Sequence, residues 1–550
     1  MTRTGSEQEA LHHSSPAALR SGTGAATLAK RAGLVALATA VLFFCYWRQS
    51  QSVPLSSDGS GNVLQAWDML HGNLLLSHWR VSDVSFYTTE LPQYMLIAAL
   101  TGLGPWVAYA AAAMTYTLLV LLAALLARGR ARGRAGLARA LLAASLMLAP
   151  QLSATSILLL SPDHIGTAVP LLAIWLLIDR CAPRWYVPPL VGLAFAGVIV
   201  ADSIVLLTGI VPLVLVCALR TCPGLVRHGE RRTSRRYELA LAGAAAVAGV
   251  AGSYAPQAIA ALGGYQQSPV GTATDLGQLQ HGSWVTLQAF LELFGGNVFG
   301  MSYFGRWPVL EVCFVALHLA GVIVAAWALG VGLARIFRFG ELIVPTFAVA
   351  IVLNLGAYMI STHARDLLGA REMAEVLPLG AVLAGRVLGD RIPGWPRSAK
   401  RWLIPVLAVP AAGYLAALAL GAAQAAVPPA SEPLATWLAA HRLSDGLAGY
   451  WQANSTTVDS QGRIVVSAVI QDPSGRLVPY QWETDDTNYD PARHYANFVV
   501  AGGPTGLPGM QKSAEFTFGR PARVYQADGY TIMVWNTNLL AALGGPRLRW

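Results

Sequence analysis

The sequence predicts a polytopic α-helical membrane protein with about 11 transmembrane helices and a small extracytoplasmic C-terminal domain of α/β or α+β type. Hydrophobic residues make up 54% of the 550-residue chain and charged residues only 12%, about half of the charged fraction in soluble domains. Several apolar runs of about 20 residues are long enough to cross a hydrocarbon layer of ~30 Å. From residue 429 onward the composition changes, with more charges, more aromatic residues and short strand-like runs.

The chain begins with a polar, Ser/Ala/Gly-rich segment over residues 1–30, which we expect to be disordered and cytoplasmic. Lys30 and Arg31 precede the first apolar run, which ends in FFCYW and lacks a small-residue cleavage site. This pattern is typical of an uncleaved signal anchor. Residues 31–428 form the predicted membrane module, with further apolar runs at about 105–127, 140–160, 165–179, 185–201, 204–219, 238–261, 309–334, 342–360, 375–389 and 402–425.

Positive charge gathers on one side of these runs. If the N-terminus is inside, the inner loops that start at residues 128, 180, 220, 335 and 386 hold 20 arginines and lysines. The outer segments hold only five such residues: Arg48, Arg80, Arg306, Arg365 and Arg371. By the positive-inside rule, the N-terminus is therefore predicted to be cytoplasmic and the C-terminal domain extracytoplasmic. Membrane anchoring then accounts for the net charge of +9, so we expect no nucleic-acid partner.

Arginine outnumbers lysine strongly, in an Ala/Gly/Leu-rich background. This bias is typical of a GC-rich bacterial genome, so the predicted location is a bacterial plasma membrane. The five cysteines form no CxxC motif and no Cys/His cluster, and none follows Cys313. The sequence therefore predicts neither a disulfide framework nor a zinc site.

The first outer loop, residues 48–104, is rich in Trp, Leu, Met and Tyr instead of being hydrophilic. Its segment GNVLQAWDMLHG places Val63, Trp67 and Leu70 on one helical face. Its segment ELPQYMLIAAL is apolar but too short to span a bilayer comfortably. Because Trp and Tyr are favoured at the membrane–water interface, both segments are predicted to be interfacial helices that hold the tail of a lipid ligand.

Acidic residues gather at the outer ends of the apolar runs, which are themselves almost free of charge. Asp58 and Asp68 lie in the first outer loop, Asp163 and His164 in the second outer turn, and Asp202 in the third. The fifth outer loop, STHARDLLGARE, adds His363, Arg365, Asp366, Arg371 and Glu372. A conduction pathway would place charges at depth. The distribution predicts instead a site on the outer face, built from carboxylates and a few arginines.

Residues 429–550 form the predicted C-terminal domain, and about 120 residues suffice for a domain with its own core. The helical segment SEPLATWLAAHRL opens this region. The strand-like runs GRIVVSAVI, NFVVAG and GYTIMVWN follow, together with the turn signals DSQG, DPSG and ADG. Alternation of a helix with short strands and turns is the basis for the α/β or α+β prediction.

The layout of nearly the whole chain resembles the GT-C superfamily of integral-membrane glycosyltransferases, which includes protein mannosyltransferases, aminoarabinose transferases and arabinosyltransferases. The shared layout comprises a long first outer loop with juxtamembrane helices, an acidic residue soon after the first span, eleven or more spans and an outer C-terminal domain. TTELPQYMLIAALTGLG is similar to the Pro-Leu-Tyr juxtamembrane segment of the family, and ARDLLGAREMAEVLPLGAVLAGR to the Arg-containing start of a late helix. This chain has Ser-Asp-Gly where many members have Asp-Glu or Glu-Asp, and Arg-Glu-Met where Arg-Tyr is commoner.

The resemblance implies an inverting transferase that moves a hexose or pentose from a polyprenyl-phosphate donor to an extracytoplasmic lipid, cell-wall glycan or protein. Asp58 lies where the family has its catalytic base, and a carboxylate suits that role. Arg365 and Arg371 are the candidates for binding the substrate phosphate, since a guanidinium matches phosphate oxygens. In some members a second acidic residue helps to bind a metal. Asp58, Asp163 and His164 are therefore the candidate site for Mg²⁺ or Mn²⁺.

Other readings stay open for the same residues. Asp58 could cap the interfacial helix, and Arg365 and Arg371 could extend toward lipid headgroups. Asp68 and Asp83 are expected to be solvated, and the stretch PYQWETDDTNYD could stack on a glycan or fill the core of the C-terminal domain. For the whole chain, the alternatives are a polytopic transporter, a lipid-linked-glycan flippase and a non-catalytic envelope scaffold. A transporter would show inverted repeats and helices broken at Gly or Pro.

Overall fold

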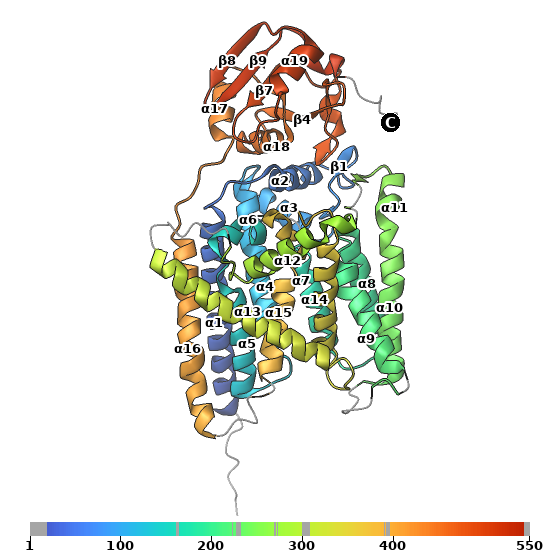
Figure 1. The fold of residues 1–550 in the computed structure, drawn as a ribbon, viewed down its shortest axis with the longest axis vertical. Coiled ribbons are helices and arrows are strands. Elements are labelled where there is room, and N and C mark those ends of the chain that lie inside the picture. The colour runs from blue at the N-terminus through green and yellow to red at the C-terminus, as the bar shows by residue number, and fades with distance from the viewer. Residues whose placement is uncertain are drawn as a thin grey trace, which may run out of the picture.

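The computed structural model describes residues 19–160, 164–222, 224–226, 233–268, 271, 273–299, 308–389, 391 and 397–543. A helical bundle forms one layer of the molecule, and the C-terminal domain covers one end of this bundle (Figure 1). Helix α1 starts at the end of the bundle away from the C-terminal domain (Figure 1).

Each of the eleven predicted apolar runs contains a helix. Their bounds are α1 Leu19–Ser50, α4 Trp106–Arg128, α5 Gly133–Leu148, α7 Ala168–Arg180, α8 Val187–Ala201, α9 Val211–Thr221, α10 Arg235–Ser253, α13 Pro308–Ala334, α14 Ile343–Met359, α15 Val376–Gly389 and α16 Arg397–Ala422. Within the described ranges, length and composition allow four stretches to cross a membrane on their own: Ala32–Ser50, Trp106–Arg128, Arg235–Ala261 and Val312–Ala334. Shorter apolar helices complete the bundle. The predicted fold class, a polytopic helical membrane protein with a small C-terminal domain, is confirmed.

Proline and irregular turns divide several of the predicted runs. α5 ends before Pro150, and the short helices η1 (Leu152–Ala154) and α6 (Thr155–Leu158) continue in a direction bent by 78°. A π-turn, η2 (Leu206–Ile210), precedes α9, and α11 (Ala255–Ala261) continues α10. Proline has no backbone N–H and clashes with the preceding helical turn, which explains the bend after α5.

Helix α15 lies at the centre of the bundle, where it packs on α4, α5, α13 and α14. All of its residues except Leu388 are buried. α13 crosses the bundle obliquely, and α16 runs beside α1 at its edge (Figure 1). The segment between α14 and α15 is therefore fixed at its C-terminal end by the best-packed helix of the molecule.

Two short helices from the first outer loop, α2 (Ser57–Leu70) and α3 (Leu91–Thr101), pack together at the end of the bundle that faces the C-terminal domain (Figure 1). Both match the segments predicted to be interfacial helices. On α3, Leu91 and Tyr94 are buried, whereas Leu96 and Leu100 are 59% and 79% exposed. The helix α12 (Leu279–Leu293) contacts the short helices η3 (Leu276–Gln278) and η4 (Leu367–Met373).

The C-terminal domain is built on a mixed six-stranded sheet of order β5-β4-β3-β7-β9-β8. β3 is parallel to β4 and β7, and the outer pairs are antiparallel. One apolar core lies on each face of the sheet, as in an α/β domain. The element bounds are α17 Glu432–Ala440, β3 Asp445–Ala448, α18 Tyr450–Asp459, β4 Val465–Gln471, β5 Leu477–Pro479, η6 Asp486–Tyr489, β7 Phe498–Gly502, α19 Met510–Phe518, β8 Arg523–Ala527, β9 Tyr530–Val534 and η7 Leu539–Ala542. The three strand-like runs of the sequence correspond to β4, β7 and β9.

A second, three-stranded sheet joins the membrane module to the C-terminal domain. Its order is β2-β1-β6, with β1 (Trp79–Val81) from the first outer loop, β2 (Gln266–Gln267) from the α11–α12 connection and β6 (Thr484–Asp485) from the C-terminal domain. Arg80 Nε also donates a hydrogen bond to Asp486 Oδ2 at 2.9 Å. These main-chain and side-chain contacts fix the position of the C-terminal domain above α2.

Candidate active site

A cavity of about 560 Å³ lies between the outer layer of the bundle and the C-terminal domain. The membrane module contributes polar side chains to its wall, among them Asp58, Asp83, His363, Arg371 and Glu372. The C-terminal domain contributes Glu483 and the aromatic side chains Tyr450, Trp451, Tyr480 and Trp482. The cavity therefore combines charged groups from one domain with aromatic surfaces from the other.

Asp58 lies in the first turn of α2, but it does not cap that helix. The N-cap is Ser56, whose hydroxyl accepts a hydrogen bond from the backbone N–H of Gly59 at 3.2 Å. Asp58 is therefore not the N-cap of α2, because the N-cap lies two residues earlier, at Ser56. Asp58 is 7% exposed. Its Oδ1 accepts a hydrogen bond from the Tyr450 hydroxyl at 2.5 Å, and its Oδ2 accepts one from Arg371 Nη1 at 3.1 Å.

Tyr450 places its hydroxyl between two carboxylates, at 2.5 Å from Asp58 Oδ1 and 3.0 Å from Glu483 Oε2. Burial, together with the negative charges of Glu483 and Asp58, raises the pKa of Tyr450 well above its ordinary value. The phenol therefore stays protonated, and its single proton is shared between the two acceptors. The Ser57 hydroxyl donates to the Tyr450 carbonyl at 2.5 Å, which fixes α18 against the start of α2.

The Glu483 side chain lies against Gly61 of α2, where a larger residue would push the carboxylate aside. A Cβ at Gly61 would lie 2.4 Å from Glu483 Oε2, which is shorter than van der Waals contact allows. Glu483 itself has a φ of 45°, in the left-handed region that residues with a side chain rarely adopt. Strained backbone of this kind is found preferentially at functional sites. The close fit and the strain both place the Glu483 carboxylate next to Asp58 and Tyr450.

Arg371 and Glu372 extend this group of charges toward the bundle. The Arg371 side chain is 33% exposed and lines the cavity while it holds Asp58. Its Nε lies 3.8 Å from Glu372 Oε1, and Glu372 Oε2 lies 2.8 Å from Nε2 of His164. A continuous chain of polar contacts therefore runs from Glu483 through Asp58 and Arg371 to His164.

His164 is clamped between two carboxylates, Asp202 at 2.7 Å from Nδ1 and Glu372 at 2.8 Å from Nε2. Burial alone would lower the pKa of His164, but Asp202 and Glu372 raise it well above its ordinary value. Burial alone would likewise raise the pKa of Glu372, but His164, His363 and Arg371 hold it below its ordinary value. His164 is therefore an imidazolium and Glu372 a carboxylate in the arrangement described.

Asp202 is fixed by two further hydrogen bonds. The Thr167 hydroxyl donates to its Oδ2 at 2.6 Å, and the backbone N–H of Ile204 donates to its Oδ1 at 2.9 Å. Glu375, in contrast, is fully buried, and neither of its carboxylate oxygens has a hydrogen-bond partner within the part of the chain that the structure describes. Burial of a polar group without a hydrogen-bond partner costs free energy, so the burial of the Glu375 carboxylate indicates a role other than packing.

The ligand atoms of His164, Asp202 and Glu375 all lie within 4.8 Å of one another. One imidazole and two carboxylates form a donor set that divalent cations such as Mn²⁺ accept, and carboxylate oxygens also suit Mg²⁺. A cation there would satisfy the oxygens of Glu375. The residues present therefore fit a divalent cation, although His164 would have to release its proton first.

The predicted site residues fall into three groups. Asp58 and Arg371 meet at the cavity, and His164 is joined to them through Glu372. Arg365 is exposed and does not line the cavity, and its carbonyl accepts a hydrogen bond from His281 Nε2 at 3.0 Å. Asp163 lies outside the described residues. The predicted metal ligands Asp58 and His164 therefore lie in different surroundings. Asp58 contacts Arg371 and Tyr450, whereas the carboxylates around His164 are those of Asp202, Glu372 and Glu375.

The two aspartates expected to be solvated differ in their surroundings. Asp68 Oδ2 accepts hydrogen bonds from Asn73 Nδ2 at 2.6 Å and from Trp79 Nε1 at 2.8 Å, so it fixes the turn that leads into β1. Asp83 lines the cavity, where burial and the charge of Glu372 raise its pKa. Asp83 is therefore partly enclosed by the cavity wall and partly exposed to the cavity.

Three residues of this arrangement were not singled out by sequence reasoning: Tyr450, Glu483 and Glu375. Glu483 lies within PYQWETDDTNYD, whose Tyr480 and Trp482 line the cavity while Tyr489 is buried in the domain core. The core reading of that stretch therefore holds for Tyr489, whereas glycan stacking on Tyr480 and Trp482 stays a prediction. For Glu375 a signal was present, since it is an acidic residue at the start of an apolar run, where charge is costly.

Comparisons with known proteins bear on the fold. No protein-family model matches the chain, and no curated protein matches it. Among solved structures, the chain is similar to ArnT from Cupriavidus metallidurans bound to undecaprenyl phosphate, with 14% identity, a TM-score of 0.55 and coverage of 94% of this chain and 99% of that one. It is also similar to ArnT from Cupriavidus metallidurans in the apo state, with 16% identity, a TM-score of 0.55 and coverage of 94% and 100%. The GT-C resemblance drawn from the sequence is thereby confirmed at the level of the fold.

Proposed function

We propose that this chain is a membrane glycosyltransferase that moves a sugar from a polyprenyl-phosphate donor to an acceptor on the outer side of a bacterial plasma membrane. The observation that carries the proposal is the Asp58–Arg371 pair, 3.1 Å between Oδ2 and Nη1, which lines a cavity of about 560 Å³ together with aromatic side chains. A base and a phosphate-binding group side by side are what transfer from a sugar phosphate needs.

Asp58 is the proposed general base. An ionised carboxylate offers about four lone-pair sites, and Tyr450 and Arg371 occupy two of those on Asp58. The acceptor hydroxyl gives its proton to Asp58 while its oxygen bonds to the anomeric carbon of the sugar. The bond from that carbon to the phosphate oxygen breaks, and polyprenyl phosphate leaves with the bonding electrons. Because attack and departure occur on opposite faces, the anomeric configuration inverts.

Arg371 is the proposed ligand of the leaving phosphate. A guanidinium has five N–H donors in a planar fork whose geometry matches the oxygens of a phosphate, so the residue type suits this role. Its 33% exposure means that a ligand in the cavity can reach it. Arg365, the second predicted phosphate ligand, does not line the cavity, and we assign the role to Arg371 alone.

The lipid part of the donor is inferred from two features. ArnT from Cupriavidus metallidurans, which has this fold, has been solved bound to undecaprenyl phosphate. In the present chain, α3 leaves Leu96 and Leu100 exposed next to the cavity layer, so an apolar surface is available for a polyprenyl tail. Trp451, Tyr480 and Trp482 in the cavity wall give the sugar apolar faces to pack on.

The proposal includes a divalent cation, Mg²⁺ or Mn²⁺, held by His164, Asp202 and Glu375. None of these three residues lines the cavity, so a bound cation would supply positive charge from behind the wall that Glu372 forms, which would favour departure of the phosphate. Thr167 and the backbone of Ile204 orient Asp202 for this role, and Glu372 holds the imidazole ring of His164. Asp58 is not one of these three residues and keeps the role of base.

The cavity is proposed to open on the outer side of the membrane, with the N-terminus in the cytoplasm. The charge asymmetry of the loops supports this orientation, since the arginine-rich connections lie at the other end of the bundle. The acceptor is then an extracytoplasmic lipid, a cell-wall glycan or a protein. The sugar, whether hexose or pentose, is set by the cavity wall.

The proposal is tested with the full-length protein in proteoliposomes. Polyprenyl phosphates that carry radiolabelled hexoses, pentoses or amino sugars are supplied one at a time, with an envelope extract as the acceptor. We expect one donor to transfer its label, with release of polyprenyl phosphate and inversion at the anomeric carbon, which NMR of the product checks. Donor that crosses the bilayer uncleaved would contradict the proposal and favour a flippase. No transfer and no translocation with any donor would favour the scaffold reading.

A further inference from the structure

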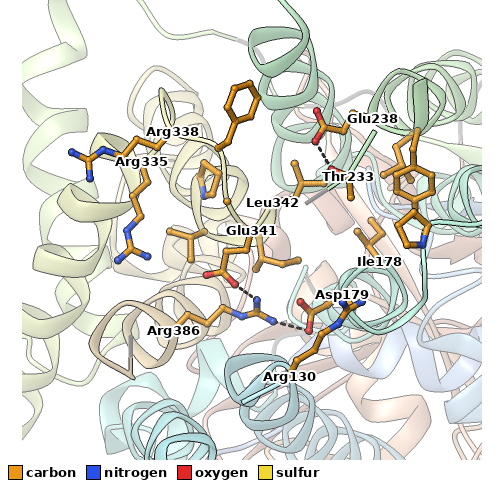
Figure 2. Close-up of a pocket in the computed structure, with 18 of the residues that line it drawn as sticks. Arg130, Ile178, Asp179, Thr233, Glu238, Arg335, Arg338, Glu341, Leu342 and Arg386 are labelled. Carbon is orange, nitrogen blue, oxygen red and sulfur yellow. Dashed lines mark hydrogen bonds and ion pairs between the residues drawn. The ribbon is translucent and has the colours of Figure 1, made fainter. Parts of the chain in front are cut away.

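A second cavity, of about 520 Å³, lies at the end of the bundle opposite to the C-terminal domain. It is enclosed by the α4–α5 connection, the end of α7, the start of α10, the α13–α14 connection and the last turns of α15. Figure 2 shows Arg335 and Arg338 on the side of this cavity opposite Ile178 and Glu238. Its volume falls in the range of small-ligand sites, roughly 300–1,000 Å³.

The floor of this inner cavity is a closed network around Arg386, which is 1% exposed. Arg386 Nη1 lies 2.6 Å from Glu341 Oε2, and its Nη2 lies 2.9 Å from Asp179 Oδ2 (Figure 2). Its Nε and Nη2 also donate to the carbonyl of Leu126, at 2.9 and 2.6 Å. These two carboxylates and the carbonyl of Leu126 contact all three nitrogens of the guanidinium. Arg386 is therefore a structural group and not a ligand-binding one.

The third carboxylate of the cavity is also taken by the protein. Glu238 pairs with the buried Arg220 at 3.1 Å and accepts a hydrogen bond from the Thr233 hydroxyl. Arg220 in turn donates to the carbonyls of Gly340 and Glu341, at 3.2 and 3.4 Å, which fixes the α13–α14 connection. Each carboxylate in the wall is thus matched by a buried arginine that holds the helices together.

Besides Arg386, four arginines line the cavity: Arg130, Arg139, Arg335 and Arg338. Arg130 donates to the carbonyls of Asp179 and Cys181, at 3.0 and 3.3 Å. The Arg338 side chain is exposed and makes no hydrogen bond or ion pair with any residue in the described ranges. Arginines gathered around a cavity of this size attract a compact multivalent oxyanion, because a guanidinium fork matches phosphate oxygens.

The position of the cavity favours a phosphate that belongs to a lipid. The wall also contains Ile178, Leu241, Leu342 and Ile343, which continue the apolar sides of the helices. Phe337, in the same α13–α14 connection, is 53% exposed, as expected for an aromatic residue at the level of the lipid headgroups. Basic pockets between helix ends at a membrane surface are typical binding sites for anionic lipid headgroups.

We propose that the inner cavity binds the phosphate headgroup of an anionic phospholipid through Arg335 and Arg338. The buried network of Arg386, Asp179 and Glu341 forms the floor that keeps the five segments in place, and the two arginines of the α13–α14 connection hold the headgroup at the rim. This inference does not rest on the proposed transfer activity, because the two cavities lie at opposite ends of the bundle (Figure 1).

The test uses the full-length protein in neutral detergent micelles, with bound lipid counted by native mass spectrometry and Tm measured by thermal unfolding. Three additions are compared: phosphatidylglycerol, phosphatidylcholine and inorganic phosphate. We expect phosphatidylglycerol to bind and to raise Tm, and the other two to have little effect. The double variant Arg335→Gln/Arg338→Gln is expected to bind phosphatidylglycerol about tenfold more weakly. The matched control is Arg134→Gln, an exposed arginine of α5 that does not line the cavity.

Several outcomes would overturn the proposal. Equal effects of phosphatidylcholine and phosphatidylglycerol would show that headgroup charge is not recognised. Protection by inorganic phosphate as strong as that by the lipid would show that the ligand is a free phosphate. An equal loss in Arg134→Gln would show a general surface charge effect. If the double variant does not fold, the single variant Arg338→Gln serves, since its side chain holds no described contact, and unchanged lipid binding in it would also contradict the proposal.

Discussion

The two cavities of the molecule are built from the same residue types in opposite proportions. Among the residues that the structure describes, the outer cavity has one arginine, Arg371, and the four carboxylates Asp58, Asp83, Glu372 and Glu483. Within the same ranges, the inner cavity has five arginines and three carboxylates. The outer cavity therefore offers acceptors for the protons of hydroxyl groups and one cation for a phosphate, whereas the inner cavity offers cations alone. The balance of charge, more than the presence of ion pairs, sets what each end can bind.

Arg386 and Arg371 differ in how deeply they are buried and in how many acceptors of the protein they contact, and we infer different roles for them from this difference. Arg386 is 2% exposed in its side chain and is saturated by two carboxylates and a carbonyl. Arg371 is 33% exposed and holds Asp58 at the wall of an open cavity. Removal of the Arg386 guanidinium should lower the stability of the fold, and removal of the Arg371 guanidinium should lower the rate of sugar transfer. Variants of these two arginines and of the residues around the outer cavity test this contrast.

The largest effect is expected for Arg386→Gln. Loss of the buried guanidinium leaves Asp179 and Glu341, whose side chains are 11% and 22% exposed, without their cation. Breaking a buried pair costs about 3–5 kcal/mol of unfolding free energy, and we expect a loss near the lower end. Unfolding in mixed micelles should show this loss. The matched control is Arg391→Gln, an exposed arginine whose guanidinium lies 4.5 Å from the Trp327 ring and which should change stability little. Equal stability of wild type and Arg386→Gln would refute the structural role.

The next effect concerns Arg371→Gln, which should lower kcat/KM for sugar transfer by about 10²–10³, the usual loss when one group that stabilises developing charge is removed. Its unfolding free energy should change by less than about 1 kcal/mol, because the pair is partly exposed. Transfer assays and unfolding on the same preparations check both values. Arg365→Gln is the control and should transfer as wild type does. If the loss appears in Arg365→Gln instead, the phosphate ligand has been assigned to the wrong arginine.

A smaller loss is expected for Tyr450→Phe. Without the hydroxyl, Asp58 and Glu483 lose their shared donor, so kcat should fall about tenfold, in line with a hydrogen bond to a charged group. The acidic limb of the pH–rate profile should also move to higher pH, because two facing carboxylates repel each other and one of them holds its proton longer. Tyr495→Phe, at an exposed position, serves as the control. An unchanged pH profile in Tyr450→Phe would contradict the sharing of the proton.

The smallest effect is a pH dependence of stability that depends on His164. The pKa of His164 is raised in the fold, so its contribution to stability is fully present below about pH 6.5, the unfolded pKa, and is lost as pH rises through the folded pKa. In EDTA, Tm should therefore fall between neutral and alkaline pH, and less so in His164→Gln. Mn²⁺ should restore Tm at alkaline pH, where the imidazole is neutral and free to bind. A pH-independent Tm in EDTA would argue against the imidazolium.

Much of the fold could be predicted because few backbone structures are stable inside a lipid bilayer. A spanning segment must satisfy its own backbone hydrogen bonds, so each long apolar run contains a helix. The strands β4, β7 and β9 were predicted from β-branched runs between turn signals. The breaks after α5 and before α9 were not predicted, although Pro150 and Pro212 lie at them, because the sequence stays apolar on both sides of each bend.

Only the part of the candidate site that the membrane module contributes could be predicted. Asp58 and Arg371 stood out as charges at the outer ends of apolar runs, where few charges occur. Their partner Tyr450 lies 392 residues after Asp58 in the chain, and the contact depends on how the three-stranded sheet docks the C-terminal domain. Nothing local to either residue encodes that docking. The N-cap of α2 could not be fixed either, because Ser56 and Asp58 both suit that role.

The most direct test of the outer cavity is the rate of sugar transfer by Asp58→Asn and Asp68→Asn, two matched changes on the same helix. Loss of a positioned base costs about 10²–10⁴ in rate, so Asp58→Asn should lose transfer by that factor while its Tm stays close to that of wild type. Asp68→Asn should keep its rate, because Asp68 holds Asn73 and Trp79 and does not line the cavity. Equal rates for wild type and Asp58→Asn would contradict the central claim.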